Sequence, residues 1–361
     1  MEFTLQLPIN NLSFGQVSLS ILKEIYEREL EPNIFPVNED ISAYSLSEDF
    51  VKWLKSCISK ATKSHDRKKL TTFRIWHLNQ HCLSSLSDKQ AVLSFYELDS
   101  PTPSEINVAK NIDSLAFSSK HSIETLSSYG VESKYIPLGF DSQHFKTLDK
   151  AYYDDGRIVF NICGKLEKRK RHSKMIRSWV RKFGNDKRYF LQCAIHNPFL
   201  KKEMPELINR MLEGEKFFNI QFLDFMGKNA VYNDFLNSGD IILGLSGGEG
   251  WGLPEFHSTA IGKHAVIMNA TGYKEWATAK NSVLVEPSGK IPSADGVFFQ
   301  EGAEYNQGRI FDFDEDSFIA ACEEAIKRVE SNKLNKEGLK LQDEFTYAKT
   351  TDKILDLIKN A

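Results

Sequence analysis

The segment GLSGGEGWGLPEFHSTAIGK, residues 244–263, combines six glycines with the carboxylate of Glu249, ahead of a helix that can begin at Pro254. The glycines at 247, 248, 250 and 252 let backbone amides approach a ligand closely. A following helix adds free N–H groups and a positive dipole end, which suit a diphosphate. Phosphate would repel Glu249, so we expect it to face hydroxyls, such as those of a sugar. The alternative is a strand-to-helix turn whose glycines serve only steric needs.

Two common nucleotide motifs are absent from this segment. The pattern G-x-G-x-x-G fails in every register of GGEGWGLPE. The pattern G-x-x-x-x-G-K-[ST] fails because Leu253 follows Gly252. The turn is therefore neither a dinucleotide fingerprint nor a P-loop.

The elements around the turn predict a parallel sheet covered by helices on both faces. Short apolar runs indicate strands at 157–163, 189–195, 219–225, 240–246, 264–270 and 282–287. Between them, helical patterns occupy 170–183, 200–213, 229–237 and 254–261. The first half repeats this less clearly, with a helix at 16–29 and strands at 3–9, 73–79, 91–98, 114–119 and 134–141. Ligands of such sheets bind beyond the carboxyl ends of the strands.

We therefore expect an α/β protein with two Rossmann-like, doubly wound domains facing a central cleft. The polar stretch 142–156 reads as a linker, so the domains are assigned to residues 1–148 and 149–344. The amphipathic segment 345–361 is expected to form a helix that crosses back to the first domain. The site belongs in the cleft between the domains.

Composition narrows the function class. The chain has 361 residues, of which 41% are hydrophobic and 26% charged, and its net charge is -3. That charge gives no global attraction to nucleic acid or membrane. Apolar runs fall short of the roughly 20 residues that span a bilayer, and the first residues lack the pattern of a secretion signal. Scattered cysteines without a C-x-x-C pair indicate buried thiols in a reducing cytosol, so we expect a cytoplasmic protein.

The segment S-x-x-E-G-W-G-L-P-E-F and its continuation AIGKHAVIMNATGYKEW resemble the donor site of retaining glycosyltransferases of family 4, which have the GT-B fold. GKLEKRKRH (164–172) resembles that family's G-R-L-x-x-x-K, and YIPLGFDSQHF (135–145) resembles its domain junction. The resemblance implies transfer of a sugar from a nucleoside-diphosphate sugar, UDP- or GDP-linked, to an acceptor hydroxyl with retention of configuration. It implies no cofactor beyond that co-substrate, and the sequence shows no metal-ligand cluster, so we expect no essential metal.

The resemblance also assigns residues. Lys165 and Lys170 match the basic residues that neutralise the donor diphosphate, and a lysine ammonium suits a leaving diphosphate. Glu249 matches the glutamate that contacts the donor sugar and is the expected catalytic residue. His257 stands where the family has a second glutamate that holds ribose, and Glu255 lies on another helix face. Further donor contacts are expected from Gly15 and from the backbone of Gly248, Trp251, Gly252 and Leu253.

Acceptor residues are expected in the first domain. His77, Glu97 and Asp99 end strands that face the cleft, and a carboxylate such as Asp99 can accept the acceptor proton. An ordinary structural role is an equal alternative for each of the three. Between 52 and 74, eight basic residues face one acid, Asp66. They form either a solvated helix face or a surface for a polyanion, in which Lys68 and Lys69 would bind DNA phosphates or anionic lipid. Trp53 is expected to be exposed nearby, where it would aid a membrane contact.

The segments EGWGLPEFHS, YKEWA and FDFDEDSFIAACEEAIKRVE also resemble glycosyltransferases of tailed bacteriophages, some of which glycosylate hydroxymethylated bases in DNA. Such a protein would act in the host cytoplasm. The acceptor is therefore DNA, a glycan or a lipid-linked sugar. Two other functions stay open: a protein that binds a nucleotide sugar or glycan without transferring it, and another GT-B enzyme such as a nucleotide-sugar epimerase.

Overall fold

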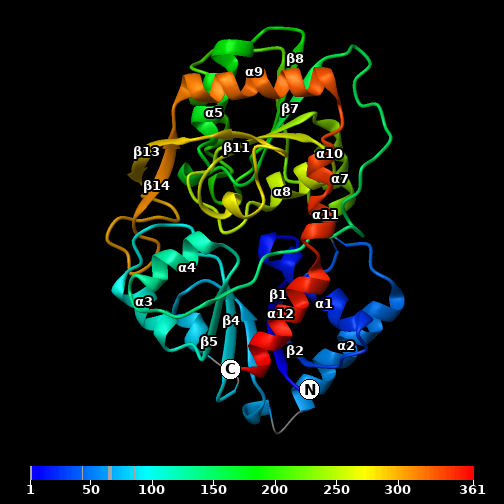
Figure 1. Ribbon diagram of the computed structural model, residues 1–361, viewed down its shortest axis with the longest axis vertical. Helices are drawn as coiled ribbons and strands as arrows, with labels where there is room; N and C mark the ends of the chain where they lie inside the picture. Colours follow the sequence, from blue (N-terminus) through cyan, green and yellow to red (C-terminus); the bar gives the residue numbers. More distant parts are fainter. Residues whose placement is uncertain (1, 43, 64–66, 85–86) are drawn as a thin grey trace.

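A computed structural model describes residues 2–42, 44–63, 67–84 and 87–361. The chain forms two parallel sheets, stacked along the long axis of the molecule with helices around each (Figure 1). The first sheet has six strands in the order β2-β1-β3-β4-β5-β6. These are β1 (Thr4–Ile9), β2 (Asn33–Glu39), β3 (Thr72–Ile75), β4 (Gln90–Ser94), β5 (Ser114–Phe117) and β6 (Lys134–Tyr135). Its helical segments are α1 (Ser13–Glu27), α2 (Glu48–Lys63), η1 (Arg67–Lys69), η2 (Gln80–Leu83), α3 (Pro103–Lys110) and α4 (Lys120–Ser127).

The second sheet has six parallel strands in the order β12-β11-β10-β7-β8-β9. These are β7 (Ile158–Cys163), β8 (Tyr189–Ala194), β9 (Ile220–Phe222), β10 (Ile241–Gly244), β11 (His264–Met268) and β12 (Val283–Val285). Its helices are α5 (His172–Phe183), α6 (Met204–Met211), α7 (Asn229–Ser238), α8 (Leu253–Ala260), α9 (Glu315–Ser331), α10 (Lys336–Leu339) and α11 (Leu341–Glu344). Short 3-10 turns are η3 (Lys168–Lys170), η4 (Pro198–Leu200) and η5 (Thr271–Glu275). The predicted class, two Rossmann-like α/β domains, is confirmed.

Several strands are shorter than the sequence predicts, and this matters for the site. β3 ends at Ile75 and β4 at Ser94, so the candidate residues His77, Glu97 and Asp99 lie in the loops that follow these strands. Apolar residues continue past each strand because the loops pack against the core: Tyr96 and Leu98 are both buried. Apolar runs therefore overestimate strand length here, while the loops still follow the carboxyl ends of parallel strands.

Three strands are among the elements that have no counterpart in the sequence prediction. β2 is an edge strand that contains Pro36, a residue whose missing N–H argues against a strand in sequence reasoning. An antiparallel hairpin, β13 (Pro287–Pro292) and β14 (Arg309–Phe313), follows β12. We call residues 287–313 the strap, because its connecting loop runs from the second domain to the first (orange in Figure 1).

The C-terminal helix α12 (Tyr347–Lys359) lies beside α1 in the first domain (red in Figure 1). Ile354, Leu357 and Ile358 are buried there, and Arg28, the residue that follows α1, forms an ion pair of 2.6 Å with Asp352. The exact domain bounds stay a prediction. In the part of the chain that the structure describes, every helix is too short or too polar to cross a membrane.

Candidate active site between the two domains

The glycine turn between β10 and α8 packs directly on the first domain. A Cβ atom at Gly248 would overlap the carbonyl oxygen of Glu97, and one at Gly250 would lie 2.7 Å from the Cβ of Phe95. Gly252 has φ of 82°, a left-handed conformation that favours glycine, and it begins α8. The glycines therefore have a steric purpose: they let the turn meet the loop after β4 at van der Waals distance.

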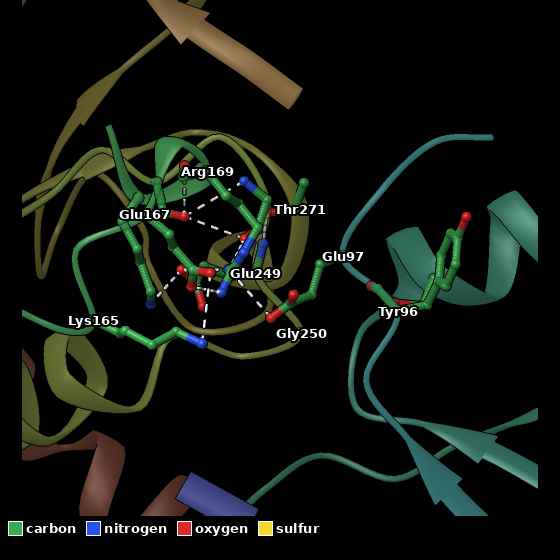
Figure 2. A network of polar contacts seen from close by, with 12 residues as sticks. Tyr96, Glu97, Lys165, Glu167, Arg169, Glu249, Gly250 and Thr271 are labelled. Carbon is green, nitrogen blue, oxygen red and sulfur yellow. Dashed lines mark hydrogen bonds and ion pairs between the residues drawn. The ribbon is translucent and has the colours of Figure 1, made fainter. Parts of the chain in front are cut away.

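Glu249 lies at the centre of a buried network of charges (Figure 2). Its Oε1 accepts hydrogen bonds from Lys170 Nζ at 2.6 Å and from Arg169 Nη1 at 3.1 Å. Only 5% of Glu249 is exposed. The Arg169 guanidinium also reaches Glu97 of the first domain at 3.1 Å and Glu167 at 2.9 Å, and it donates to the carbonyl of Gly248. One arginine thus joins the turn, the basic segment after β7 and the first domain.

Two carboxylates of this network, Glu249 and Glu97, differ in protonation. Burial alone would raise the pKa of Glu249, but the Lys170 ammonium and then the Arg169 guanidinium hold it below its ordinary value. Burial raises the pKa of Glu97 to about 7, with Arg169 opposing and the negative charge of Glu249 adding to the shift. Glu249 is therefore ionised, while Glu97 titrates near neutrality. Pairs of carboxylates with separated pKa values are typical of acid–base sites.

Lys165 lies on the outer side of the network. Its Nζ is 3.4 Å from the centroid of the Phe298 ring in the strap and 3.7 Å from Glu167. Burial lowers the pKa of this ammonium, and Glu167 partly restores it. Lys165, Arg169 and Lys170 thus face Glu97, Glu167 and Glu249, three cations against three carboxylates.

The backbone of Glu249 is held by a residue in a rare conformation. Thr271 has φ of 50°, which is uncommon for a β-branched residue and costs on the order of 1–3 kcal/mol. Its hydroxyl accepts a hydrogen bond from Glu249 N at 3.1 Å, and Gly272 N donates to Glu249 O at 2.9 Å. Sequence reasoning missed Arg169, Glu167 and Thr271; the only signal for the first two was their place in the basic segment KLEKRK.

His257, predicted to contact ribose or phosphate, lies in aromatic surroundings at the domain junction. Its ring stacks on Phe145, with centroids 4.1 Å apart, and only 3% of the residue is exposed. Burial lowers its pKa to about 3, so the imidazole is neutral. Among the described residues its Nδ1 finds no hydrogen-bond partner. Its role toward the nucleotide stays a prediction.

The other residues assigned to the donor surround the turn. Trp251 packs against Phe256 and Phe345, and its carbonyl accepts from the Trp276 indole at 2.9 Å. Leu253 is the first residue of α8. Gly15 lies in the first turn of α1, where a Cβ would overlap the backbone of Asn10. That end of α1 meets the second domain, because Gln16 hydrogen-bonds Asn229 at 2.9 Å. Glu255 is buried near Lys170, and burial raises its pKa to about 7.

Asp99 is held by the strap instead of joining the Glu249 network. Its carboxylate accepts from Lys290 Nζ at 2.8 Å and from Arg309 N at 2.8 Å. Burial opposes ionisation, but these donors hold the pKa of Asp99 below its ordinary value. Glu97 is the first-domain carboxylate that the structure brings to Arg169. His77 lies beside it near the same cations, and burial lowers its pKa to about 4.

The basic segment 52–74 does not gather at the cleft. Lys68 and Lys69 lie in η1, directly before β3, at the amino end of a strand whose carboxyl end leads to His77. Arg74 is buried within β3, where it donates to the carbonyl of Cys82, and Trp53 packs on Tyr26 and Phe50. The expectation of an exposed Trp53 is therefore wrong, since half-buried aromatic packing holds it. Asp66 lies outside the described residues.

Comparison with known proteins identifies the fold. No protein-family model and no curated protein sequence matches the chain. Among solved structures, it is similar to HepE of Anabaena in complex with UDP and glucose, with 13% identity over 100% of both chains and a TM-score of 0.68. Sucrose-phosphate synthase of Thermosynechococcus elongatus shares 12% identity over 99% of this chain and 98% of that chain, with a TM-score of 0.67. A glycosyltransferase of Rickettsia africae shares 12% identity over the same shares of both chains, with a TM-score of 0.65.

These likenesses span nearly the whole chain, so they cover both domains and their arrangement. Within the described residues, His, Cys, Asp and Glu side chains do not gather in groups of three or more that could hold a metal ion. The chain therefore has the two-domain fold of these glycosyltransferases, the GT-B fold, with a buried charge network where its domains meet.

Proposed function

We propose that this protein transfers a sugar from a nucleoside-diphosphate sugar to an acceptor hydroxyl, with retention of configuration. The observation that carries the proposal is the pairing of Glu249 with Lys170 and Arg169 at the contact between the domains. The network contains cations for a diphosphate and an ionised carboxylate for sugar hydroxyls. A protein with the same fold has been crystallised with UDP and glucose, which supports this class of donor.

Each charged group then has a role. Lys170 and Lys165 neutralise the diphosphate, and their value rises as the sugar–oxygen bond breaks and its electron pair stays with the diphosphate. The acceptor oxygen forms a bond to the anomeric carbon on the same face that the diphosphate leaves, which retains the configuration. It gives its proton to Glu97, whose pKa near 7 suits a general base. Glu249 holds the donor sugar. The backbone amides of Gly248, Trp251, Gly252 and Leu253 would lie around the sugar and phosphate.

A second candidate is a protein that binds a nucleotide sugar without transferring it. The buried, neutral His257 favours it, because an imidazole cannot chelate two ribose hydroxyls as a carboxylate does. An epimerase is a third reading, which predicts interconversion of free nucleotide sugars without an acceptor.

One experiment separates these functions. UDP and GDP are titrated into the protein by calorimetry, and a panel of UDP- and GDP-sugars is then tested with and without glycan, lipid and DNA acceptors. The expected result is transfer of the sugar with its anomeric configuration unchanged, as observed by NMR. Binding without turnover across the panel would support the second candidate, and epimerisation without acceptor the third.

A further inference from the structure

The strap forms a second set of contacts between the domains, away from Glu249. Asp99 binds Lys290 and the backbone N–H of Arg309, each at 2.8 Å. Farther along the loop, the backbone N–H of Asn306 donates to Glu105 of α3 at 2.8 Å. Phe299 and Ile310 of the strap are buried in the hydrophobic cluster of the first domain. These contacts fix the strap over the loops that follow β3 and β4.

A pocket of about 160 Å³ lies between the strap and these loops. Phe95, Tyr96 and Phe299 give it aromatic walls, while His77, Glu97 and Tyr305 add polar groups. Glu97 is shared between the pocket and the Arg169–Glu249 network, so the pocket adjoins the proposed donor site. Figure 2 shows Glu97 directed toward Glu249, whereas the neighbouring Tyr96 points the opposite way.

The size and charge of the pocket restrict what it can hold. A cavity of about 150 Å³ admits a ring of the size of benzene, so there is room for about one six-membered ring. All eleven residues that line the pocket are described, and none is Lys or Arg. Two of them, Glu97 and Glu105, are carboxylic acids. A phosphate or another anion would find no cation in this lining, because Arg169, which pairs with Glu97 at 3.1 Å, does not line the pocket. Aromatic walls with a few polar groups instead suit a neutral, hydroxyl-bearing ring.

We infer that this pocket binds one monosaccharide unit of a neutral glycan acceptor, and that the strap of the second domain supplies part of its binding surface through Tyr305 and Asn306. The inference rests on the proposed function, because it assigns that reaction's acceptor. A hydroxyl of the bound unit would lie beside Glu97, the group that takes its proton. A lining without a lysine or arginine selects against nucleic acid and anionic lipid at this position.

The test measures acceptor binding separately from donor binding. Methyl glycosides of neutral hexoses and of N-acetylhexosamines are titrated into the full chain with UDP present, using saturation-transfer NMR. Tyr305→Ala should weaken glycoside binding at least about tenfold. Asn306→Gly should also weaken it, and glycine can keep the left-handed φ of 58° that Asn306 has in the folded chain. Val297→Ala is the matched control, because Val297 is exposed on the same strap and does not line the pocket.

UDP affinity is expected to stay unchanged in all three variants. If UDP fails to bind the unmodified protein, the proposed donor site is wrong, whereas the glycoside titration still tests the pocket. The inference is overturned if no neutral glycoside binds, or if both strap variants bind glycosides as well as Val297→Ala does. It is also overturned if an oligodeoxynucleotide or a phosphatidylglycerol vesicle binds and Tyr305→Ala removes that binding.

Discussion

The carboxylate of Glu249 lies 2.6 Å from the ammonium of Lys170, across 79 residues of sequence. The residue expected to hold the donor sugar is thus neutralised by a residue expected to hold the diphosphate. Both are buried, so their pairing offsets part of the cost of holding each charge in the interior. A bound diphosphate would compete with Glu249 for Lys170 and free the carboxylate toward the sugar.

Lys170→Ala should weaken UDP binding and transfer, because the developing charge on the diphosphate loses a preorganised cation. A loss of about 2–4 kcal/mol in transition-state stabilisation is expected. Calorimetry with UDP and initial rates provide the measurement. Lys182→Ala is the control, since Lys182 forms an exposed ion pair with Glu323 on the same domain. Equal UDP affinity in the two variants would remove Lys170 from the donor site.

Gly248→Ala should destabilise the protein by about 1–3 kcal/mol, because the added methyl group overlaps the Glu97 carbonyl across the domain contact. Gly289→Ala adds the same methyl group where no atom lies within 4 Å and should be neutral. Urea unfolding of both variants measures the difference. A Gly248→Ala protein as stable as Gly289→Ala would show that the close contact between turn and loop does not form.

Local patterns in the sequence predict much of this architecture. The six strands of the second sheet and the glycine turn after β10 follow from apolar runs bounded by turn residues. Pairing across the domains does not follow, because Glu97, Arg169 and Glu249 belong to three separate segments that meet only in the folded chain. The strap was not predicted for a similar reason. Its two strands, β13 and β14, are separated by a loop, and their antiparallel pairing forms only in the folded chain.

Transfer should rise as the pH increases through about 7, since Glu97 must be deprotonated to accept the acceptor proton. Glu97→Gln should remove this rise and lower the rate by a factor on the order of 10²–10⁴. Glu301→Gln, an exposed change on the strap, should keep the wild-type profile. A Glu97→Gln enzyme with the same pH profile as the wild type would show that another group takes the proton.

Acid should destabilise the protein in part through His257. Its pKa is about 3 in the folded chain and about 6.5 when unfolded, so its contribution is complete above about pH 6.5 and is lost as the pH falls toward 3. The slope from this group approaches about 1.4 kcal/mol per pH unit. Urea unfolding at several pH values should show a shallower slope for His257→Gln than for the exposed control His81→Gln. Identical slopes would contradict a buried, neutral His257.

Glu249→Ala tests the central claim most directly, with transfer rate, UDP affinity and melting temperature measured on the same protein. If Glu249 holds the donor sugar, transfer falls by at least about a hundredfold. UDP still binds, because Lys170 is released from its carboxylate partner and remains available to the diphosphate. Full transfer activity in Glu249→Ala would contradict the claim, and a joint loss of stability and UDP binding would reduce the turn to a structural contact between the domains.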